Sequence, residues 1–344
     1  MTFSAPKTIT TSLDSFAIIG NGSWATALVK IFSDNGNHVD WYVRKEEDLD
    51  YIKVHFQNPK YLRGLKFNPD RITPSNKLNT IISRNKWIIL ATPSAFLEET
   101  FEQIKVPLNN KIIVSGVKGI LPNSKMLVGV YLEKKFDIKT EQIVVIAGPC
   151  HAEEIAKNRL SFLTLGCSDL DIALSLKSLM SNSYLNISVS KDVTGIEIAA
   201  VIKNIYEMVA GIAKGLDYGD NFQSVLICNS IMEMKALLNK INPTERNIDN
   251  TVYLGDLIVT AYSEYSRNRR FGELIRKGYS TKEALQKMKM IAEEYFATKN
   301  FSSLKQGIEA ETPIIDSLYD ILFKEESAEK IGQKFNLKGC FKLL

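Results

Sequence analysis

The chain has 344 residues, of which 45% are hydrophobic and 24% are charged, as in ordinary globular proteins, and its length favours two domains. The 43 basic and 39 acidic residues leave a net charge of +4, which excludes the strongly basic balance of nucleic-acid-binding proteins, so any anion site must be local. The four cysteines lack metal-ligand spacing; we expect reduced thiols and no metal site.

The first 13 residues are rich in Ser and Thr and are expected to form a loose arm. This arm lacks the apolar core of a signal peptide, and no later apolar run reaches the roughly 18 residues of a membrane span. We therefore expect a cytoplasmic protein without stable membrane insertion.

Short apolar strands alternate with helical stretches from residue 14 to about residue 190. This alternation predicts an α/β domain whose parallel sheet is covered on both faces. The charged run 44–50 is interpreted as a solvated surface. The predicted strands cover residues 16–20, 38–43, 86–93, 111–119 and 142–149, and residues 161–167 and 184–190 are expected to extend the sheet.

Beyond residue 190 the sequence changes to long helical segments, which begin with residues 195–215 and 224–241. We therefore predict three parts. They are a loose arm over residues 1–13, an α/β domain over residues 14–190 and an all-α domain over residues 191–344.

Gly20, Gly22 and Ala25 form the pattern GxGxxA at the end of the first strand. In the dinucleotide fingerprint the first glycine permits the turn, the second lets a pyrophosphate approach, and the third small residue lets the helix pack closely. The N–H groups at the start of that helix then face the phosphates. The alternative is a tight turn without a ligand, but the position in the first βαβ unit favours a nucleotide.

The end of the second predicted strand bears on the choice of cofactor. An acidic residue there binds the ribose of NAD, whereas a basic one accommodates the 2′-phosphate of NADP. Arg44 and Lys45 stand at this place, followed by Glu46. The pattern favours NADP without excluding NAD, and the alternative is that Arg44 is a plain exposed charge.

Ligands of such sheets collect at the carboxyl ends of the strands. Lys118 lies on a loop at this edge, where it can meet a substrate phosphate or carboxylate, or simply be solvated. Gly148 begins a turn of small residues after a later strand. Cys150 and His151 are adjacent in this turn and are not expected to act as a nucleophile and its base.

In the helical half, Lys203 and Asn204 interrupt an apolar run. A lysine in such surroundings at a domain interface can be desolvated and act as a general base, or it can extend its ammonium to solvent. Residues 253–275 hold Asp256 and a basic cluster at 266–270 in which Arg stands beside Ser and Asn, a donor set suited to phosphate. Part of this cluster, Arg269 and Arg270, can equally be plain surface.

Together these stretches resemble the bacterial NAD(P)-dependent glycerol-3-phosphate dehydrogenases, from about Ser15 to Phe335. The resemblance implies a Rossmann-type parallel-sheet domain followed by a helical domain of the 6-phosphogluconate-dehydrogenase type. The motifs follow the family's order: GxGSWGTA is similar to residues 20–27, KG to 118–119, GP to 148–149, Lys-Asn to 203–204, GDLxxT to 255–260 and SRNR to 266–269.

The resemblance also implies a role for each matching residue. Lys203 would be the proton acceptor, with Asp256 and Lys118 beside it in catalysis. The implied substrate-binding residues are Lys118, Gly148, Cys150, Asn204, Asp256, Ser266, Arg267 and Asn268. The implied cofactor-binding residues are Gly20, Gly22, Ser23, Trp24, Arg44, Lys45, Lys118, Ala152, Arg267, Ile291 and Glu293.

Three residues depart from the family pattern. Ala25 replaces the usual glycine, which the fingerprint tolerates. Cys150 stands where Ser or Thr is usual, so a weaker thiol donor replaces a hydroxyl. Glu294 follows Glu293 where glycine is usual, which bears on the local backbone and on cofactor preference.

The implied reaction is the reversible reduction of dihydroxyacetone phosphate to sn-glycerol 3-phosphate by NADH or NADPH, which supplies glycerophospholipid synthesis. Its partner would be a small phosphorylated substrate, and a homodimer is common in the family. Two alternatives stay open: a related dehydrogenase of a β-hydroxy acid or keto acid, and an NADP-sensing protein without turnover. The SRNR cluster favours a phosphate over a lone carboxylate, and Lys203, Lys118 and Asp256 favour an enzyme over a sensor.

Overall fold

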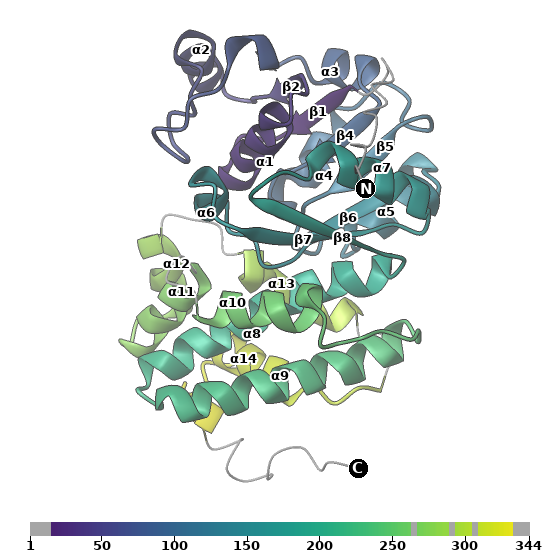
Figure 1. Ribbon diagram of the computed structural model, residues 1–344. Helices are drawn as coiled ribbons and strands as arrows, with labels where there is room; N and C mark the ends of the chain where they lie inside the picture. The colour runs from purple at the N-terminus through teal and green to yellow at the C-terminus, as the bar shows by residue number, and fades with distance from the viewer. Residues whose placement is uncertain (1–14, 263–266, 289–292, 305–308, 333–344) are drawn as a thin grey trace, which may run out of the picture.

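The computed structural model describes residues 15–262, 267–288, 293–304 and 309–332. An α/β half that contains the sheet lies against a half built of helices (Figure 1). The strands are β1 (Phe16–Ile19), β2 (Val39–Tyr42), β3 (Ile72–Ser75), β4 (Trp87–Leu90), β5 (Ile112–Ser115), β6 (Ile143–Ala147), β7 (Ser161–Gly166) and β8 (Leu185–Ser190). In the described part of the chain they form one sheet in the order β3-β2-β1-β4-β5-β6-β7-β8.

The two faces of the sheet follow from the alternation of side chains along each strand. In β1, Phe16 and Ile18 pack on one face, and Ala17 and Ile19 pack on the other. The first face is covered by α1 (Ser23–Asp34) and α7 (Leu170–Met180), with the short α6 (Ala152–Ala156) beside α1. The opposite face is covered by α3 (Leu78–Arg84), α4 (Ser94–Glu102) and α5 (Val128–Phe136), and α2 (Glu46–His55) lies after β2.

The prediction of a parallel sheet is confirmed from β1 to β6, but β7 runs antiparallel to β6. The connection between them contains only the five-residue α6, and Phe162 N donates to Pro149 O, which turns the chain back beside β6. Strand β3 was not among the predicted strands, because Pro74 and the polar, half-buried Thr73 and Ser75 leave Ile72 as its one buried apolar residue.

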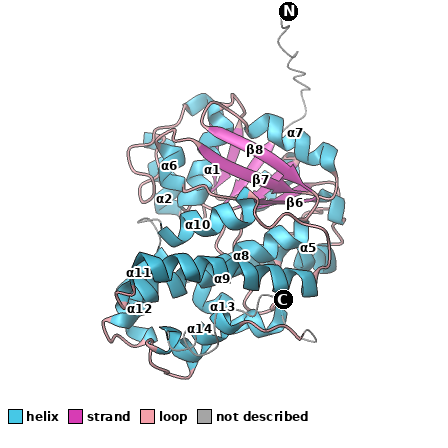
Figure 2. Ribbon diagram, turned by 60° about the horizontal axis from the view of Figure 1, so that its bottom comes forward, coloured by secondary structure: helices cyan, strands magenta, loops and turns pink. Residues whose placement is uncertain are grey.

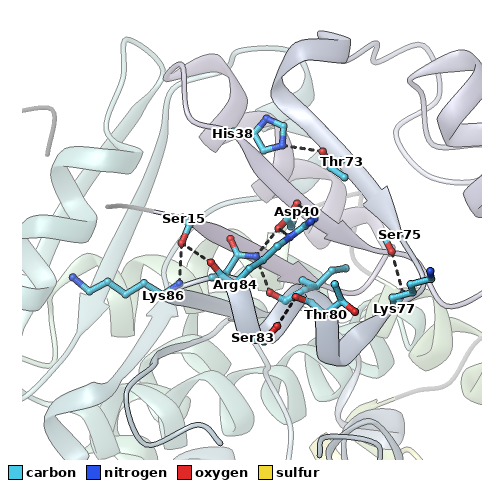
Figure 3. A network of polar contacts seen from close by, with 12 residues as sticks. Ser15, His38, Asp40, Thr73, Ser75, Lys77, Thr80, Ser83, Arg84 and Lys86 are labelled. Atoms are coloured by element: carbon cyan, nitrogen blue, oxygen red, sulfur yellow. Dashed lines mark hydrogen bonds and ion pairs between the residues drawn. The ribbon is translucent and has the colours of Figure 1, made fainter. Parts of the chain in front are cut away.

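The amino ends of the strands are joined by a polar network (Figure 3). The buried Asp40 of β2 accepts hydrogen bonds from Arg84, and from Asn85 at 2.6 Å. His38 Nε2 lies 2.9 Å from Thr73 Oγ1 and so connects β2 to β3. These polar groups form hydrogen bonds with one another. They lie at the amino edge of the sheet, opposite to the carboxyl edge that bears the glycine-rich turn.

The helical half is arranged around α8 (Val193–Gly215), which is buried along nearly its whole length. Gly272 packs directly on α8, because a Cβ there would lie 2.4 Å from Ile212 N. Figure 2 shows α8 and α10 on the side nearer the sheet. The other helices are α9 (Gly219–Ile241), α10 (Asp256–Tyr262), α11 (Arg267–Arg276), α12 (Thr281–Met288), α13 (Glu293–Leu304) and α14 (Pro313–Phe323). Within the described residues, no helix is long and apolar enough to cross a bilayer.

Candidate active site

The glycine-rich turn between β1 and α1 has the geometry that a dinucleotide requires. Gly20 has φ +133°, and a Cβ there would lie 2.7 Å from Ala91 O, so a side chain is excluded. A Cβ at Gly22 would meet none of the described residues within 4 Å, which leaves space in front of the helix. In the described part of the chain no side chain caps α1, which begins at Ser23, so its first N–H groups are available to an anion.

Side chains far away in the sequence hold this turn in place. Trp41 Nε1 donates to Gly20 O at 2.7 Å. The buried Asn58 donates to Asn21 O at 2.9 Å and to Thr26 Oγ1 at 2.8 Å. The turn is therefore fixed without a ligand, which lowers the entropic cost of binding one.

The interpretation of residues 44–50 as a solvated surface is wrong for Asp48 and Leu49, which are both buried. These residues lie in the first turn of α2, with Leu49 facing the core. Asp48 accepts a hydrogen bond from Asn21 Nδ2 at 3.2 Å and pairs with Lys60 Nζ at 2.6 Å. This carboxylate therefore supports the residue between the two glycines.

Arg44 and Lys45 are exposed where β2 ends, as a contact with a cofactor requires. Arg44 Nη1 lies 3.4 Å from Glu99 Oε2, and its guanidinium carbon lies 5.3 Å from the Phe96 ring centroid. Because this ion pair is exposed, it holds Arg44 only weakly. The guanidinium is thus placed on the cofactor side of the sheet and can turn to a phosphate.

Trp24 lies between the glycine-rich turn and the loop after β5. A Cβ at Gly116 would be 2.5 Å from Trp24 Nε1, and Lys118 Nζ is 5.9 Å from the Trp24 ring centroid. The indole N–H is buried and has no hydrogen-bond partner among the described residues. A buried donor of this kind fits a polar ligand that lies against the turn.

The two halves of the molecule meet at a buried ion pair. Lys203 Nζ of α8 lies 2.8 Å from Asp256 Oδ1, at the start of α10. The second carboxylate oxygen, Oδ2, accepts a hydrogen bond from Gly148 N, 3.2 Å away at the end of β6. Lys203 also donates to Thr260 Oγ1 at 3.1 Å. The carboxyl edge of the sheet is therefore tied to the lysine of the central helix.

The charges in this site influence one another strongly because they are buried. Burial alone would raise the pKa of Asp256, but the ammonium groups of Lys203 and Lys118 hold it below its ordinary value. The pKa of Lys118 is lowered, first by burial and then by the neighbouring Lys203. The site thus places an ionised carboxylate beside two lysine side chains, whose N–H donors suit an anionic substrate.

The structure also places three further predicted residues, Asn204, Cys150 and Ala152. Asn204 Nδ2 donates to Lys118 O at 3.4 Å, which joins α8 to the loop after β5. Cys150 is buried, and desolvation raises its pKa to about 12, so its thiol stays protonated. Ala152 begins α6, which packs against α1.

Several predicted residues lie outside the described part of the chain, either entirely or in their side chains. Ser266 and Ile291 lie outside the described residues. Arg267 and Asn268 begin α11, and Glu293 begins α13, but only their backbone is described. Their predicted contacts with substrate and cofactor stay predictions.

The sequence analysis missed three groups of side chains around the site. Thr260 follows Asp256 by one helical turn, and the GDLxxT motif was a signal that could have revealed it. Asn58 supports the glycine-rich turn from a loop without a recognisable motif. Asp192, at the start of α8, joins Arg246 and Tyr253 in a cluster described below.

Two family models match most of the chain. NAD-dependent glycerol-3-phosphate dehydrogenase N-terminus matches residues 15–173, and the corresponding C-terminus matches residues 192–333. A glycerol-3-phosphate dehydrogenase (NAD(P)+) of Exiguobacterium sp. is 33% identical over 313 residues, 90% of this chain and 92% of that relative. Another, from Chlorobium limicola, is 31% identical over 316 residues, 91% of this chain and 95% of the relative.

A solved structure supports the fold. Glycerol-3-phosphate dehydrogenase from Coxiella burnetii superimposes with a TM-score of 0.87 at 24% identity, over 95% of this chain and 100% of that one. The predicted Rossmann-type domain with a helical domain behind it is confirmed, and so is the resemblance that the motifs indicated. The chain belongs to the family of NAD-dependent glycerol-3-phosphate dehydrogenases.

Proposed function

We propose that this protein is an NAD(P)-dependent oxidoreductase that reversibly reduces dihydroxyacetone phosphate to sn-glycerol 3-phosphate, a precursor of glycerophospholipids. The observation that carries the proposal is the buried Lys203–Asp256 ion pair, which Gly148 N ties to the carboxyl edge of a dinucleotide-type sheet. The family and the names of the relatives agree with this activity.

The chain's own residues handle the proton. In the reduction, the Lys203 ammonium donates a proton to the oxygen on substrate C2 as negative charge develops there; in the oxidation, its neutral amine removes the hydroxyl proton. Asp256 accepts a hydrogen bond from Lys203 at 2.8 Å and so fixes the direction of that ammonium. Lys118, on the loop after β5, would supply a second hydrogen-bond donor beside the reacting oxygen.

The substrate phosphate is assigned to the start of α11. Arg267 and Asn268 are the first two residues of α11, and Ser266 precedes them in the sequence. A guanidinium beside amide and hydroxyl donors suits phosphate, and a phosphate held away from C2 supplies binding energy that orients the reacting carbon.

The glycine-rich turn is assigned to NAD or NADP. When bound, the nicotinamide exchanges a hydride with substrate C2. Gly20, Gly22, Ser23 and Trp24 would hold its pyrophosphate region, and Arg44 with Lys45 would contact the adenosine end. Lys118, Ala152, Arg267, Ile291 and Glu293 complete the proposed cofactor contacts.

We further propose a homodimer in the cytoplasm, with the dinucleotide-binding domain over residues 14–190 and the substrate-binding domain over residues 191–344. The change from sheet to helix between β8 and α8 supports this division. Analytical ultracentrifugation of the purified chain tests the homodimer, since a monomer at working concentration would contradict it.

The activity is tested by following nicotinamide absorbance with dihydroxyacetone phosphate and either NADH or NADPH. Wild type is expected to oxidise at least one cofactor, and Lys203→Met is expected to bind cofactor without turnover. Lys214→Met is the matched control, because Lys214 is an exposed lysine on the same helix.

Other outcomes would redirect the assignment. Turnover with a keto acid that lacks phosphate, and none with dihydroxyacetone phosphate, would indicate a related dehydrogenase. Cofactor binding by folded protein without turnover of any such substrate would indicate a sensor. Either result would remove the assignment of a phosphate to the start of α11.

A further inference from the structure

A second, half-buried ion pair lies where α8 begins, apart from Lys203 and Asp256. The Asp192 carboxylate accepts hydrogen bonds from Arg246 Nε at 2.7 Å and Nη2 at 3.2 Å, and from the Tyr253 hydroxyl. Arg246 belongs to the segment between α9 and α10, and Tyr253 belongs to the π-helical turn Thr251–Gly255. Three chain segments therefore converge on one carboxylate, which we call the Asp192 cluster.

Asp192 is built into the first turn of α8. Its Oδ1 accepts the Gly195 amide at 3.0 Å, the hydrogen bond of an N-cap. A Cβ at position 195 would lie only 2.2 Å from Asp192 Oδ2, so the glycine makes room for the carboxylate to reach its partners. The Asp192 carboxylate is thus fixed relative to α8, the helix that carries Lys203.

Arg246 is committed to this cluster. The Arg246 side chain is 3% exposed and makes a two-pronged pair with Asp192. The same guanidinium donates to Asn242 O at 3.0 Å, at the end of α9. A planar fork held by a carboxylate and a backbone carbonyl fixes the connection between α9 and α10 in one orientation.

Tyr253 extends the cluster to the catalytic carboxylate. Its π-helical turn ends at Gly255, and α10 begins at the next residue, Asp256. The hydroxyl of Tyr253 therefore anchors the turn from which Asp256 projects, while Asp192 anchors the helix from which Lys203 projects. Single π-helical turns occur often at functional sites, where they re-aim a side chain.

We propose that Arg246 and Tyr253 are positioning residues, which hold the Asp256 turn against α8 and so keep Asp256 within hydrogen-bonding distance of Lys203. This inference rests on the proposed function. Proton transfer tolerates little displacement, because a shift of about 1 Å in a catalytic group can cost on the order of 100-fold in rate. The Asp192 carboxylate thus connects the two segments that carry the Lys203–Asp256 pair, namely α8 and the turn before α10.

The cluster keeps its charges over the working pH range. Burial would raise the pKa of Asp192, but the hydrogen bonds from Arg246 and Tyr253 hold it below its ordinary value. Burial and the hydrogen bond to Asp192 raise the pKa of the Tyr253 hydroxyl, which therefore stays protonated as a donor. The contacts that position the turn are thus intact wherever the carboxylate is ionised.

The first experiment compares wild type with Tyr253→Phe, which removes one hydroxyl and keeps the ring. We expect kcat to fall about tenfold, with the dihydroxyacetone phosphate KM and the cofactor Kd changed by less than about twofold. The isotope effect on kcat with cofactor deuterated at the transferred position is expected to rise, because the chemical step becomes slower. Tyr218→Phe is the matched control, since Tyr218 also loses one hydroxyl contact, 3.3 Å from Glu329 O.

The second experiment substitutes Arg246 with Lys and with Met. Arg246→Met is expected to lose kcat as Tyr253→Phe does, and Arg246→Lys is expected to recover part of the loss because it restores one ion pair. Unchanged kcat in Tyr253→Phe and Arg246→Met would overturn the inference. A fall in kcat accompanied by equally large rises in KM and in the cofactor Kd would also overturn it. Wild type without turnover would instead contradict the proposed function.

Discussion

The carboxylate of Glu197 accepts a hydrogen bond from the amide of Gly129, 3.0 Å away, and thereby connects α8 to the first turn of α5. Both residues are buried. A Cβ at position 129 would lie 3.0 Å from Glu197 Oε2, so a side chain there would crowd this contact. The helix N-terminus favours a negative charge at this place, while burial disfavours one.

Burial dominates this balance and predicts a pH-dependent stability. It raises the pKa of Glu197 from 4.5 to about 7, against the lowering effect of the Gly129 and Val128 amides. The folded chain therefore binds this proton more tightly than the unfolded chain, so the free energy of unfolding falls as the pH rises from about 5 through 7. Glu197→Gln, which mimics the protonated acid, should remove roughly 2 to 3 kcal/mol of that fall.

Urea unfolding at pH 5.5 and pH 8 measures this difference in each variant. The variant retains a second contribution, because burial also raises the pKa of Glu233 to about 8, so Glu197→Gln should reduce the pH dependence of the free energy of unfolding without abolishing it. Glu102→Gln, at an exposed glutamate in α4, is the control. Equal pH dependence in wild type and Glu197→Gln would refute the assignment.

The hydroxyl of Thr260 is expected to matter to catalysis through Lys203. Thr260→Val removes one of the two acceptors of the ammonium and leaves Asp256 in place, and a hydrogen bond to a charged group contributes about 1.5 to 3 kcal/mol. We expect kcat to fall about tenfold with little change in cofactor Kd. Thr260→Ser keeps the hydroxyl and should stay within about threefold of wild type. Identical kcat values in the Val and Ser variants would show that the hydroxyl has no part in the reaction.

Periodicity could predict the parts of the fold that bury a repeating face. Phe16 and Ile18 alternate with Ala17 and Ile19, so β1 was evident from the sequence. The edge strand β3 was not evident, because Pro74 and half-buried neighbours carry no alternation. The direction of β7 depends on how the chain turns after Gly148, which a strand's own pattern does not encode.

The site divides in the same way. Residues inside short motifs, such as Gly20, Lys203 and Asp256, could be named because the motif carries their chemistry. Asn58 and Asp192 could not, since their partners Asn21 and Arg246 lie 37 and 54 positions away. A lone polar residue gains such a partner only through tertiary packing, which leaves no periodic signal.

Asn58 therefore provides a direct test of how the glycine-rich turn is held. Asn58→Ala removes the hydrogen bonds to Asn21 O and Thr26 Oγ1 and leaves the turn freer before binding. We expect the cofactor Kd to rise about tenfold, while kcat at saturating cofactor stays near wild type. Energy transfer from tryptophan to the reduced nicotinamide measures the Kd.

Asn58 Oδ1 accepts the amide of Lys60 at 2.9 Å, and Asn68 Oδ1 likewise accepts the amide of Asp70 at 3.0 Å. Asn68→Ala serves as the comparison, because Asn68 lies outside the glycine-rich turn. Its cofactor Kd should equal that of wild type. If Asn58→Ala lost kcat while its cofactor Kd stayed unchanged, the side chain would act on the substrate region rather than on the turn.

Cys150 is expected to be chemically silent despite its place beside Lys118. Desolvation raises the pKa of its thiol to about 12, and Lys118 lowers it only in part, so almost no thiolate exists at pH 8. Alkylation depends on the thiolate and on access, and Cys228 is exposed whereas Cys150 is buried. Iodoacetamide followed by peptide mass mapping should therefore modify Cys228 well before Cys150.

The same reasoning predicts that Cys150→Ser remains active. The hydroxyl is a stronger hydrogen-bond donor than the thiol it replaces, and it is smaller, so the substrate KM should stay the same or fall while kcat changes by less than about threefold. A thiol that took part in covalent chemistry would behave differently: Cys150→Ser would then lose turnover, and alkylation of the native protein would inactivate it in step with Cys150 modification. Because the raised pKa removes the nucleophile, the rate of inactivation should instead be independent of Cys150 occupancy.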